Sequence, residues 1–260
     1  MASLLYKLKK EAPLVHCITN YVAMNISANT LLAIGASPAM IHTPEETAEF
    51  AKIAGALTIN IGTISPHWLR GMKNAIESAK SNNVPWVFDP VAHFATPFRN
   101  ELALELLSLQ PNILRGNASE IIGLSGNQSA AKGVDSKDEV DSAENAAKKI
   151  AVDHKSIVIV TGVTDLITDG KQVIRVEGGS NIMPKVTALG CSLTCLLGAF
   201  VAIEDPLKAS LSATTIFSVA GKRAHKISKG PGSFAQNFID QISLIEDTEF
   251  EKLLIANENI

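Results

Sequence analysis

Reactive and polar residues occur at three places where a predicted strand passes into a predicted helix. Asp89 follows the apolar run 84–88, the segment 117–120 (NASE) follows residues 113–116, and the segment 187–191 (TALGC) precedes the helical C-terminal part. In a parallel α/β sheet, ligands bind beyond the carboxyl ends of the strands, where helix N-termini meet phosphate groups. These three segments are therefore the first candidates for a functional site.

The segment 187–191 leads into an apolar helix. Consecutive backbone N–H groups would point at whatever lies above that helix and would cradle developing negative charge. The helix dipole at Cys191 favours the thiolate, which predicts a pKa below the value of about 8.5 of a free thiol. A helix cap followed by a buried thiol explains the segment equally well. Cys195, one turn later, and Cys17 in the first strand are predicted to lie in the core.

Four further residues could bind a metal or an anion. Glu120 could reach a Mg²⁺ ion, which takes one or two carboxylates plus substrate phosphates, but Asn117 with Glu120 three residues later is also a capping box. Asp89 has the stronger functional case, because an unpaired buried carboxylate is costly and a strand end beside a cleft relieves that cost. Arg115 and Thr161, each at a strand end, could face an anionic ligand, although a surface ion pair and a turn hydroxyl are ordinary alternatives.

Other familiar nucleotide and hydrolase motifs are not found. The chain has no Gly-x-x-x-x-Gly-Lys-Ser/Thr, no Gly-x-Gly-x-x-Gly after its first strand and no Gly-x-Ser-x-Gly. P-loop, dinucleotide-binding and α/β-hydrolase chemistry are therefore disfavoured.

Composition indicates a globular protein. Of the 260 residues 46% are hydrophobic and 19% charged, and 23 Lys+Arg against 26 Asp+Glu give a net charge of −3 without a basic stripe, so no nucleic-acid partner is expected. No apolar stretch approaches the roughly 20 residues that span a bilayer, and residues 1–13 predict a short amphipathic helix rather than a signal peptide. Three cysteines make no disulfide framework, so we expect a reducing compartment, the cytoplasm.

The elements that must position the candidate residues alternate along the chain. Short β-rich runs at 14–18, 39–42, 57–61, 85–89, 112–115 and 156–161 are each followed by helical periodicity, which predicts a mostly parallel sheet covered on both faces. Strands at 165–168 and 172–176 flank the turn 169–171 and predict an antiparallel edge. Helices are predicted from 191 to 202, from 207 to about 229, and again after 233.

Two helix starts, one loop and the number of domains are also predicted. Thr43 and Ser65, each followed by proline, are expected to cap helices. The polar segment 125–141 is expected to be a mobile loop. Because no linker, low-complexity tract or repeat divides the chain, residues 1–260 are expected to form one domain.

Together these motifs closely resemble the hydroxyethylthiazole kinases of thiamine salvage, a family with the ribokinase-like fold. The matching segments cover roughly residues 10 to 240 in the family's order: 16–20 (HCITN), 27–29, 35–40 (GASPAM), 60–63 (NIGT), 88–91 (FDPV), 95–99 (ATPFR), 115–120 (RGNASE), 132–135 (KGVD), 160–162 (VTG), 185–194 and 229–234 (KGPGSF).

The resemblance implies a three-layer αβα fold and transfer of the ATP γ-phosphoryl group to the primary alcohol of 4-methyl-5-(2-hydroxyethyl)thiazole. It also implies a role for each matching position. Cys191 matches the catalytic position, where most ribokinase-like enzymes have Asp, and the backbone of Ala188, Leu189, Gly190 and Cys191 matches the anion hole. Asp89 and Glu120 match Mg²⁺-binding positions, Arg115 and Thr161 nucleotide-binding positions, and Asn20, Met40, Gly62 and Ala188 the thiazole pocket. A homotrimer with active sites between subunits is implied as well.

Two alternatives stay open at this point. One is another ribokinase-like enzyme, such as a pyrimidine or pyridoxal kinase or a hydrate dehydratase, against which Cys191 and the segment 37–40 argue. The other is a non-catalytic paralogue that only binds ligands.

The chain also departs from the family pattern. Ala188 stands where glycine is usual, Leu189 replaces a smaller residue, and Ala92-His93-Phe94 replaces a small, Gly-rich run. We expect these changes to narrow the site, and we expect His93 to be a solvent-facing loop residue.

Overall fold

The computed structural model describes residues 4–126 and 136–258. Within these ranges, eight strands form one sheet in the order β2-β1-β3-β4-β5-β6-β7-β8. Neighbours from β2 to β6 pair in parallel, whereas β7 runs antiparallel to both β6 and β8, so the predicted mixed sheet with an antiparallel edge is confirmed. The strands are β1 (Leu14–Ile18), β2 (Ser37–Ala39), β3 (Ala56–Asn60), β4 (Trp86–Asp89), β5 (Ile113–Asn117), β6 (Ile157–Thr161), β7 (Thr164–Thr168) and β8 (Val173–Glu177).

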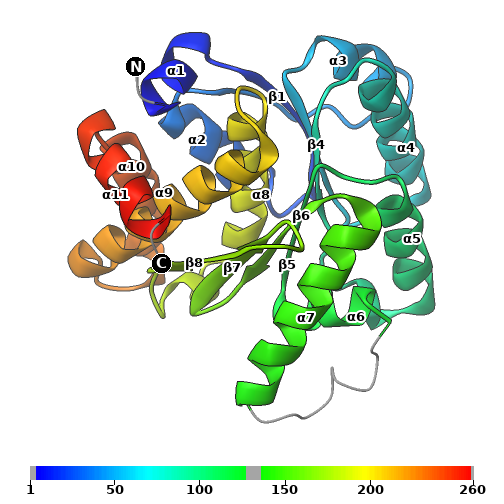
Figure 1. Ribbon diagram of the computed structural model, residues 1–260. Coiled ribbons are helices and arrows are strands. Elements are labelled where there is room, and N and C mark those ends of the chain that lie inside the picture. Colours follow the sequence, from blue (N-terminus) through cyan, green and yellow to red (C-terminus); the bar gives the residue numbers. More distant parts are fainter. Residues whose placement is uncertain (1–3, 127–135, 259–260) are drawn as a thin grey trace.

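Helices cover both faces of this sheet and give three layers (Figure 1). One face carries α1 (Leu4–Glu11), α2 (Met24–Ile34), α8 (Leu189–Val201), α9 (Pro206–Ile227), α10 (Pro231–Ser243) and α11 (Asp247–Glu258). The other carries α3 (Thr47–Ile53), α4 (Pro66–Ser81), α5 (Pro97–Ser108), α6 (Ala118–Leu124) and α7 (Ser136–His154). Two short 3₁₀ helices, η1 (His93–Ala95) and η2 (Met183–Lys185), lie in connections. Within residues 4–126 and 136–258, no helix is both long and apolar enough to cross a bilayer.

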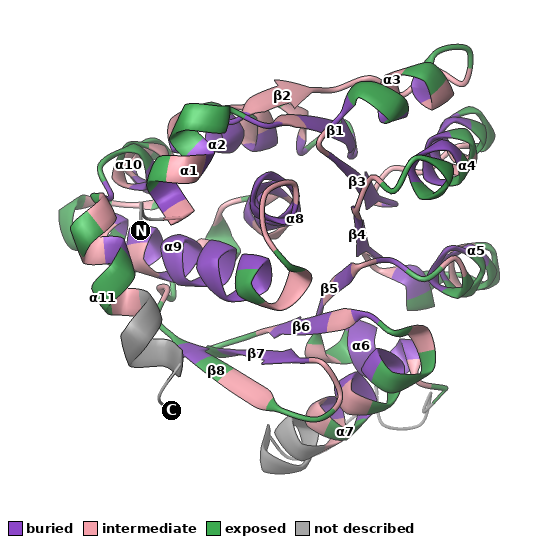
Figure 2. Cartoon of the chain, turned by 45° about the horizontal axis from the view of Figure 1, so that its top comes forward, coloured by how far each residue is buried: buried purple, intermediate pink, exposed green. Residues whose placement is uncertain are grey.

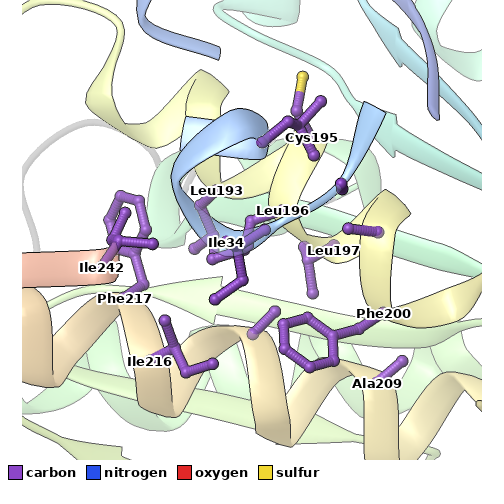
Figure 3. Close-up of a cluster of buried hydrophobic side chains, with 14 of the residues drawn as sticks. Ile34, Leu193, Cys195, Leu196, Leu197, Phe200, Ala209, Ile216, Phe217 and Ile242 are labelled. Atoms are coloured by element: carbon purple, nitrogen blue, oxygen red, sulfur yellow. The ribbon is translucent and has the colours of Figure 1, made fainter. Parts of the chain in front are cut away.

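Each face has its own hydrophobic core, and α8 lies at the centre of the larger one. Figure 2 shows α8 buried between the sheet and α9. Figure 3 shows Leu196, Phe200 and Ile216 among the packed side chains of this cluster. The second cluster, under α4, α5 and α7, includes the fully buried Trp86. Burial on both faces explains why the parallel strands are apolar throughout rather than alternating.

The two predicted helix starts have different outcomes. Ser65 caps α4 as predicted, with its side chain accepting a hydrogen bond from the Trp68 backbone N–H. Thr43 does not cap a helix, because α3 begins only at Thr47, after Glu46, without a side-chain cap. The Thr43 hydroxyl donates instead to Glu45, 2.9 Å away. The sequence 43–46 therefore forms a turn before the helix.

Two other predicted boundaries are wrong. The second strand covers Ser37–Ala39 rather than 39–42, and Pro38 is tolerated there because β2 is an edge strand that needs fewer backbone donors. The predicted loop 125–141 is wrong for its last part, since α7 already begins at Ser136. Residues 127–135 lie outside the described residues.

The strand order places a topological switch point at one position on the carboxyl edge of the sheet. From β1 the chain first adds β2 on one side and then β3 on the other. The loops after β1 and β3 therefore leave the sheet in diverging directions, and such a topological switch point is where ligands bind in open α/β sheets.

Candidate active site

Polar side chains from five adjacent strands form one continuous row at this edge, which we call the polar row: Asn20, Asn60, Asp89, Arg115 and Thr161. Asn20 Nδ2 donates to Asn60 Oδ1 at 2.8 Å, and Asn60 Nδ2 donates to Asp89 Oδ2 at 2.8 Å. Arg115 then bridges Asp89 Oδ2, 3.4 Å away, and Thr161 Oγ1, 2.8 Å away. The structure thus joins four of the predicted site residues through hydrogen bonds.

Asp89 is fully buried, and its two oxygens differ. Oδ2 accepts from Asn60, Arg115 and Thr194, the last at 2.8 Å. Oδ1 has no hydrogen-bond partner within the described parts of the chain. Burial raises the pKa of this carboxyl to about 6; Arg115 opposes the rise and the negative charge of Glu120 adds to it. A bound cation beside Oδ1 would give this oxygen the partner that the described chain does not supply.

Arg115 carries the positive charge of the polar row. Its side chain is only 12% exposed. Burial alone would lower its pKa, but Asp89 and Glu120 outweigh burial, so the pKa is raised and the guanidinium stays charged. A Cβ on Gly190 would lie 2.5 Å from Nη2 of this guanidinium. Glycine at position 190 therefore lets the α8 backbone approach Arg115.

The N-terminus of α8 meets the polar row without a side-chain cap. Ala188, the N-cap residue, has a left-handed backbone with φ +60°, and no side chain of the described chain caps the helix there. The first N–H groups of a helix have no intrahelical partner, so those of residues 188–191 are available to an anion. The Leu189 side chain is buried in the larger hydrophobic cluster and packs there.

The predicted low pKa of Cys191 is wrong. Burial raises the pKa of the half-buried thiol to about 12, Asp89 raises it further, and Arg115 opposes the rise. The helix dipole stabilises a thiolate only weakly, and this cannot outweigh the cost of desolvating a thiolate beside a carboxylate. Asn20 Nδ2 lies 3.5 Å from Sγ, so Cys191 does touch the polar row, as a thiol rather than a thiolate. Cys17 and Cys195 are buried, as predicted.

Glu120 forms the complete capping box that its spacing predicted. Its Oε2 accepts from the Asn117 N–H at 2.9 Å, and Asn117 Oδ1 accepts from the Glu120 N–H at 2.9 Å. Its other oxygen, Oε1, accepts from the Ala92 N–H in the loop after β4. Glu120 therefore holds the start of α6 and the loop after β4, and its negative charge lies close enough to raise the pKa of Asp89.

These two carboxylates fit the donor set of Mg²⁺. In the parts of the chain that the structure describes, no three His, Cys, Asp or Glu side chains gather as a closed metal site. Mg²⁺ needs no such cage, because it takes one or two carboxylates and completes its octahedron with water and phosphate oxygens. The unpartnered Oδ1 of Asp89 fits one such position.

The four residues matched to the thiazole pocket do not all join the polar row: Asn20 belongs to it, and Ala188 is the N-cap residue of α8. Gly62 packs directly on Asn20, since a Cβ at position 62 would lie 2.6 Å from Asn20 Nδ2, and its N–H donates to Asn60 Oδ1. Met40 follows β2 and packs, partly buried, against the larger hydrophobic cluster. It stands outside the hydrogen-bonded row.

Sequence reasoning missed Asn60 and Thr194 as site residues. Asn60 ends the buried strand ALTIN beside the switch point, and a polar residue at that strand end could have marked it as a site residue. Thr194 lies three residues after Cys191, so both face the same side of α8. Only the structure shows that this side faces Asp89.

His93 is not the solvent-facing residue that we expected. Its side chain is fully buried, with Nε2 donating to the Glu120 carbonyl at 2.9 Å and Nδ1 lying 3.3 Å from Asn100 Oδ1. His93 therefore braces the loop after β4. Phe94 is half exposed and stands edge-on to this imidazole.

Solved structures share this fold. The pyridoxal kinase of Bacillus subtilis in complex with ADP superposes with a TM-score of 0.61 at 18% identity, over 80% of this chain and 90% of that one. The hydroxyethylthiazole kinase protein of Pyrococcus horikoshii OT3 superposes with a TM-score of 0.88 at 38% identity, over 95% and 94% of the two chains. The protein is thus a kinase with the ribokinase-like fold, as predicted.

Sequence comparisons narrow this class to one family. Residues 5–248 match the model of the hydroxyethylthiazole kinase family. A hydroxyethylthiazole kinase of Rhizobium rhizogenes is 56% identical over 94% of this chain and 92% of its own length, and one of Gemmatimonas aurantiaca is 57% identical over 94% and 88%. The chain belongs to the hydroxyethylthiazole kinase family.

Proposed function

We propose that this protein transfers the γ-phosphoryl group of ATP to the primary hydroxyl of 4-methyl-5-(2-hydroxyethyl)thiazole. A bond forms between the alcohol oxygen and the γ-phosphorus, the bond to the β–γ bridging oxygen breaks, and ADP and the hydroxyl proton leave. The observation that carries the proposal is the meeting of Asp89, Arg115 and the uncapped N-terminus of α8 at one end of the sheet. Phosphoryl transfer depends mainly on such positioning and charge stabilisation.

Each part of the site has a role in this reaction. Arg115 and Thr161 hold the phosphates of the nucleotide, and the N–H groups of residues 188–191 stabilise charge on the transferred group. Cys191, protonated near neutral pH because of its raised pKa, hydrogen-bonds the acceptor hydroxyl. A strong base is not required, since the loose transition state of phosphoryl transfer lets the hydroxyl proton leave late.

Mg²⁺ belongs to the proposal and has its own test. When bound, the ion neutralises charge on the phosphates; Asp89 would hold it directly and Glu120 through water. Glu120→Gln keeps one carbonyl oxygen for capping and removes the charge. We expect the Mg²⁺ concentration for half-maximal turnover to rise about tenfold, as for other loosened outer ligands. If the Mg²⁺ dependence is unchanged while the helix stays folded, the capping box alone explains Glu120.

The substrate is tested by measuring ADP release with and without the thiazole alcohol and by detecting the phosphate ester by ³¹P NMR. Pyridoxal and a hydroxymethylpyrimidine serve as competing alcohols. A kcat/KM at least tenfold higher for the thiazole alcohol supports the proposal. Faster turnover of another alcohol, or ATP binding without any turnover, would reject it.

The proposal includes the oligomeric state and the location. The cytoplasmic location rests on the reducing compartment expected from the three cysteines. The support for a homotrimer with sites between subunits is the exposure of Tyr21 and Val22, 64% and 55%, directly beside Asn20. A neighbouring subunit would cover these side chains. Light scattering during size-exclusion chromatography tests the trimer, and a monomeric mass would contradict it.

A further inference from the structure

Arg99 contacts the carbonyl groups of two different loops at the edge of the candidate site. It lies in the first turn of α5 and is half-buried. Nε donates to the Ala92 carbonyl at 3.1 Å and Nη2 to the Val91 carbonyl at 2.5 Å, both in the loop after β4. Nη2 also donates to the Ile61 carbonyl at 2.7 Å and Nη1 to the Gly62 carbonyl at 3.4 Å, in the loop after β3.

Each loop is also held on its other side, the loop after β3 by the polar row and the loop after β4 by Glu120. The Gly62 N–H donates to Asn60, and the Ala92 N–H donates to Glu120. Ala92 has a left-handed backbone with φ +50°, a conformation that persists only where the surroundings fix it. Arg99 and Glu120 bind this peptide region from two directions. The guanidinium thus links the two loops through their carbonyl groups, beyond the hydrogen bonds of Asn60 and the Ile61 N–H to Asp89 at the strand ends.

We propose that Arg99 is a positioning residue that sets the distance between the loop carrying Gly62 and the loop that follows Asp89. This inference rests on the proposed function, in which Asp89 lies near the phosphates and Cys191 near the acceptor hydroxyl; Gly62 packs on Asn20, which contacts Cys191. A planar guanidinium offers five N–H donors in a fixed fork, so it can serve both loops at once. Small misplacements of a reacting group, about 1 Å, can cost about 100-fold in rate.

The position of Arg99 predicts an asymmetric kinetic effect. Of the two loops that it contacts, the loop after β3 lies on one side of β4, whereas Arg115 and Thr161 lie on β5 and β6, on the other side. Loosening the two loops should therefore impair use of the alcohol and leave nucleotide binding nearly intact. A residue needed only for folding would lower all parameters together.

The kinetic test uses Arg99→Lys and Arg99→Met, with Arg175→Lys as the matched control. Arg175 pairs with Glu144 and lies on β8, the edge strand that β5, β6 and β7 separate from β4. For Arg99→Lys, which keeps the charge but loses the fork, we expect kcat/KM for the thiazole alcohol to fall about tenfold; for Arg99→Met the expected fall is about 100-fold. KM for ATP should change less than twofold, and the control should match the wild type. Unchanged kinetics, or a parallel loss for both substrates that follows the melting temperature, would overturn the inference.

A second measurement is independent of the substrate. Hydrogen exchange of the unliganded protein should become faster at the amides of 61–63 and 91–95 together in Arg99→Lys, and stay unchanged in α9. Unchanged exchange in both loops would refute the link even if the protein proved inactive toward the thiazole alcohol. Inactivity of the wild type, with faster loop exchange in the variant, would reject only the proposed function.

Discussion

The helix α8 begins in one environment and ends in another, and its two cysteines record the difference. Cys191 is half-buried, and its Sγ lies 3.5 Å from Asn20 Nδ2. The charges of Asp89 and Arg115 act on its pKa in opposite directions. Cys195, one turn later, is 1% exposed and lies 3.6 Å from the Thr58 hydroxyl; Figure 3 shows it in the same buried hydrophobic cluster as Leu196 and Phe200. Distance from the carboxyl edge of the sheet, rather than residue type, separates the two roles. Changes at the polar end should cost activity, and changes at the apolar end should cost stability.

The largest effect is expected from Asp89→Asn. The variant removes the charge and places an amide where three donors now converge, so kcat should fall about 1000-fold, the scale of losing a central electrostatic group. The free energy of unfolding near pH 7 should stay equal or rise, because burial of this carboxylate is costly, as its raised pKa indicates. Steady-state kinetics and urea titration measure the two quantities. If Asp89→Asn lost stability but kept its kcat, the polar end would behave as we expect of the apolar end, and the comparison would be wrong.

Asp165 is a buried carboxylate just outside the polar row. It allows the effect of a buried charge on stability to be measured apart from any effect on catalysis. Burial raises the pKa of Asp165 from 3.8 to about 6, opposed by the Gly162 N–H and by Arg115. A carboxyl with a raised folded pKa contributes stability that is full below about pH 4 and is lost as the pH rises through about 6. The free energy of unfolding should therefore fall by no more than about 3 kcal/mol between pH 4.5 and 8 on account of this group.

Asp165→Asn is the matched comparison for that change. The amide oxygen still accepts from Gly162, but the group no longer titrates, so the difference between wild type and variant should grow with pH in the variant's favour. Urea titrations at the two pH values measure it, and kcat should fall far less than in Asp89→Asn. A pH-independent difference would mean that Asp165 titrates near its ordinary pKa.

The two cysteines give the next, smaller effects. Cys191→Ala should lower kcat about tenfold, while ATP binding and stability change little. This fall is smaller than the loss of a general base usually causes, because the thiol is protonated. Cys191→Asp should preserve or raise activity, since a carboxylate accepts a proton more readily beside Arg115. Cys195→Ala should cost about 1 kcal/mol of stability through a small cavity and leave kcat unchanged. Wild-type turnover in Cys191→Ala would remove this residue from the site.

The sequence predicted the elements better than it predicted their electrostatics. Apolar runs and turn residues located the strands to within one to three residues, because burial on both faces and tight turns are local properties. The positions of Asp89, Arg115 and Thr161 followed from strand ends meeting at one edge. The raised pKa of Cys191, the burial of His93 and the role of Thr194 could not follow, because each depends on what a distant element packs against it.

The smallest effect concerns the N-cap of α8, where the resemblance predicts glycine and the chain has Ala188. Its φ of +60° and ψ of 11° are costly for a residue with a Cβ. Ala188→Gly should therefore stabilise the protein by about 0.5–1 kcal/mol, the left-handed penalty less the entropy that glycine adds to the unfolded chain. If the Cβ also narrows the site, kcat/KM should rise.

A matched control separates these two consequences of the Cβ. Ala12 is exposed, has φ +44° and lies between α1 and β1, away from the polar row, so Ala12→Gly should give a similar stabilisation without a kinetic change. Adding Phe94→Gly to Ala188→Gly tests whether the exposed Phe94 ring narrows the site as well. His93→Ala is less useful, because it would remove the hydrogen bond from His93 to the Glu120 carbonyl. If kcat/KM rises in Ala188→Gly but not in Ala12→Gly, the Cβ of Ala188 narrows the site. Equal melting-temperature gains with unchanged kinetics in both would mean that Ala188 strains the backbone without obstructing the substrate.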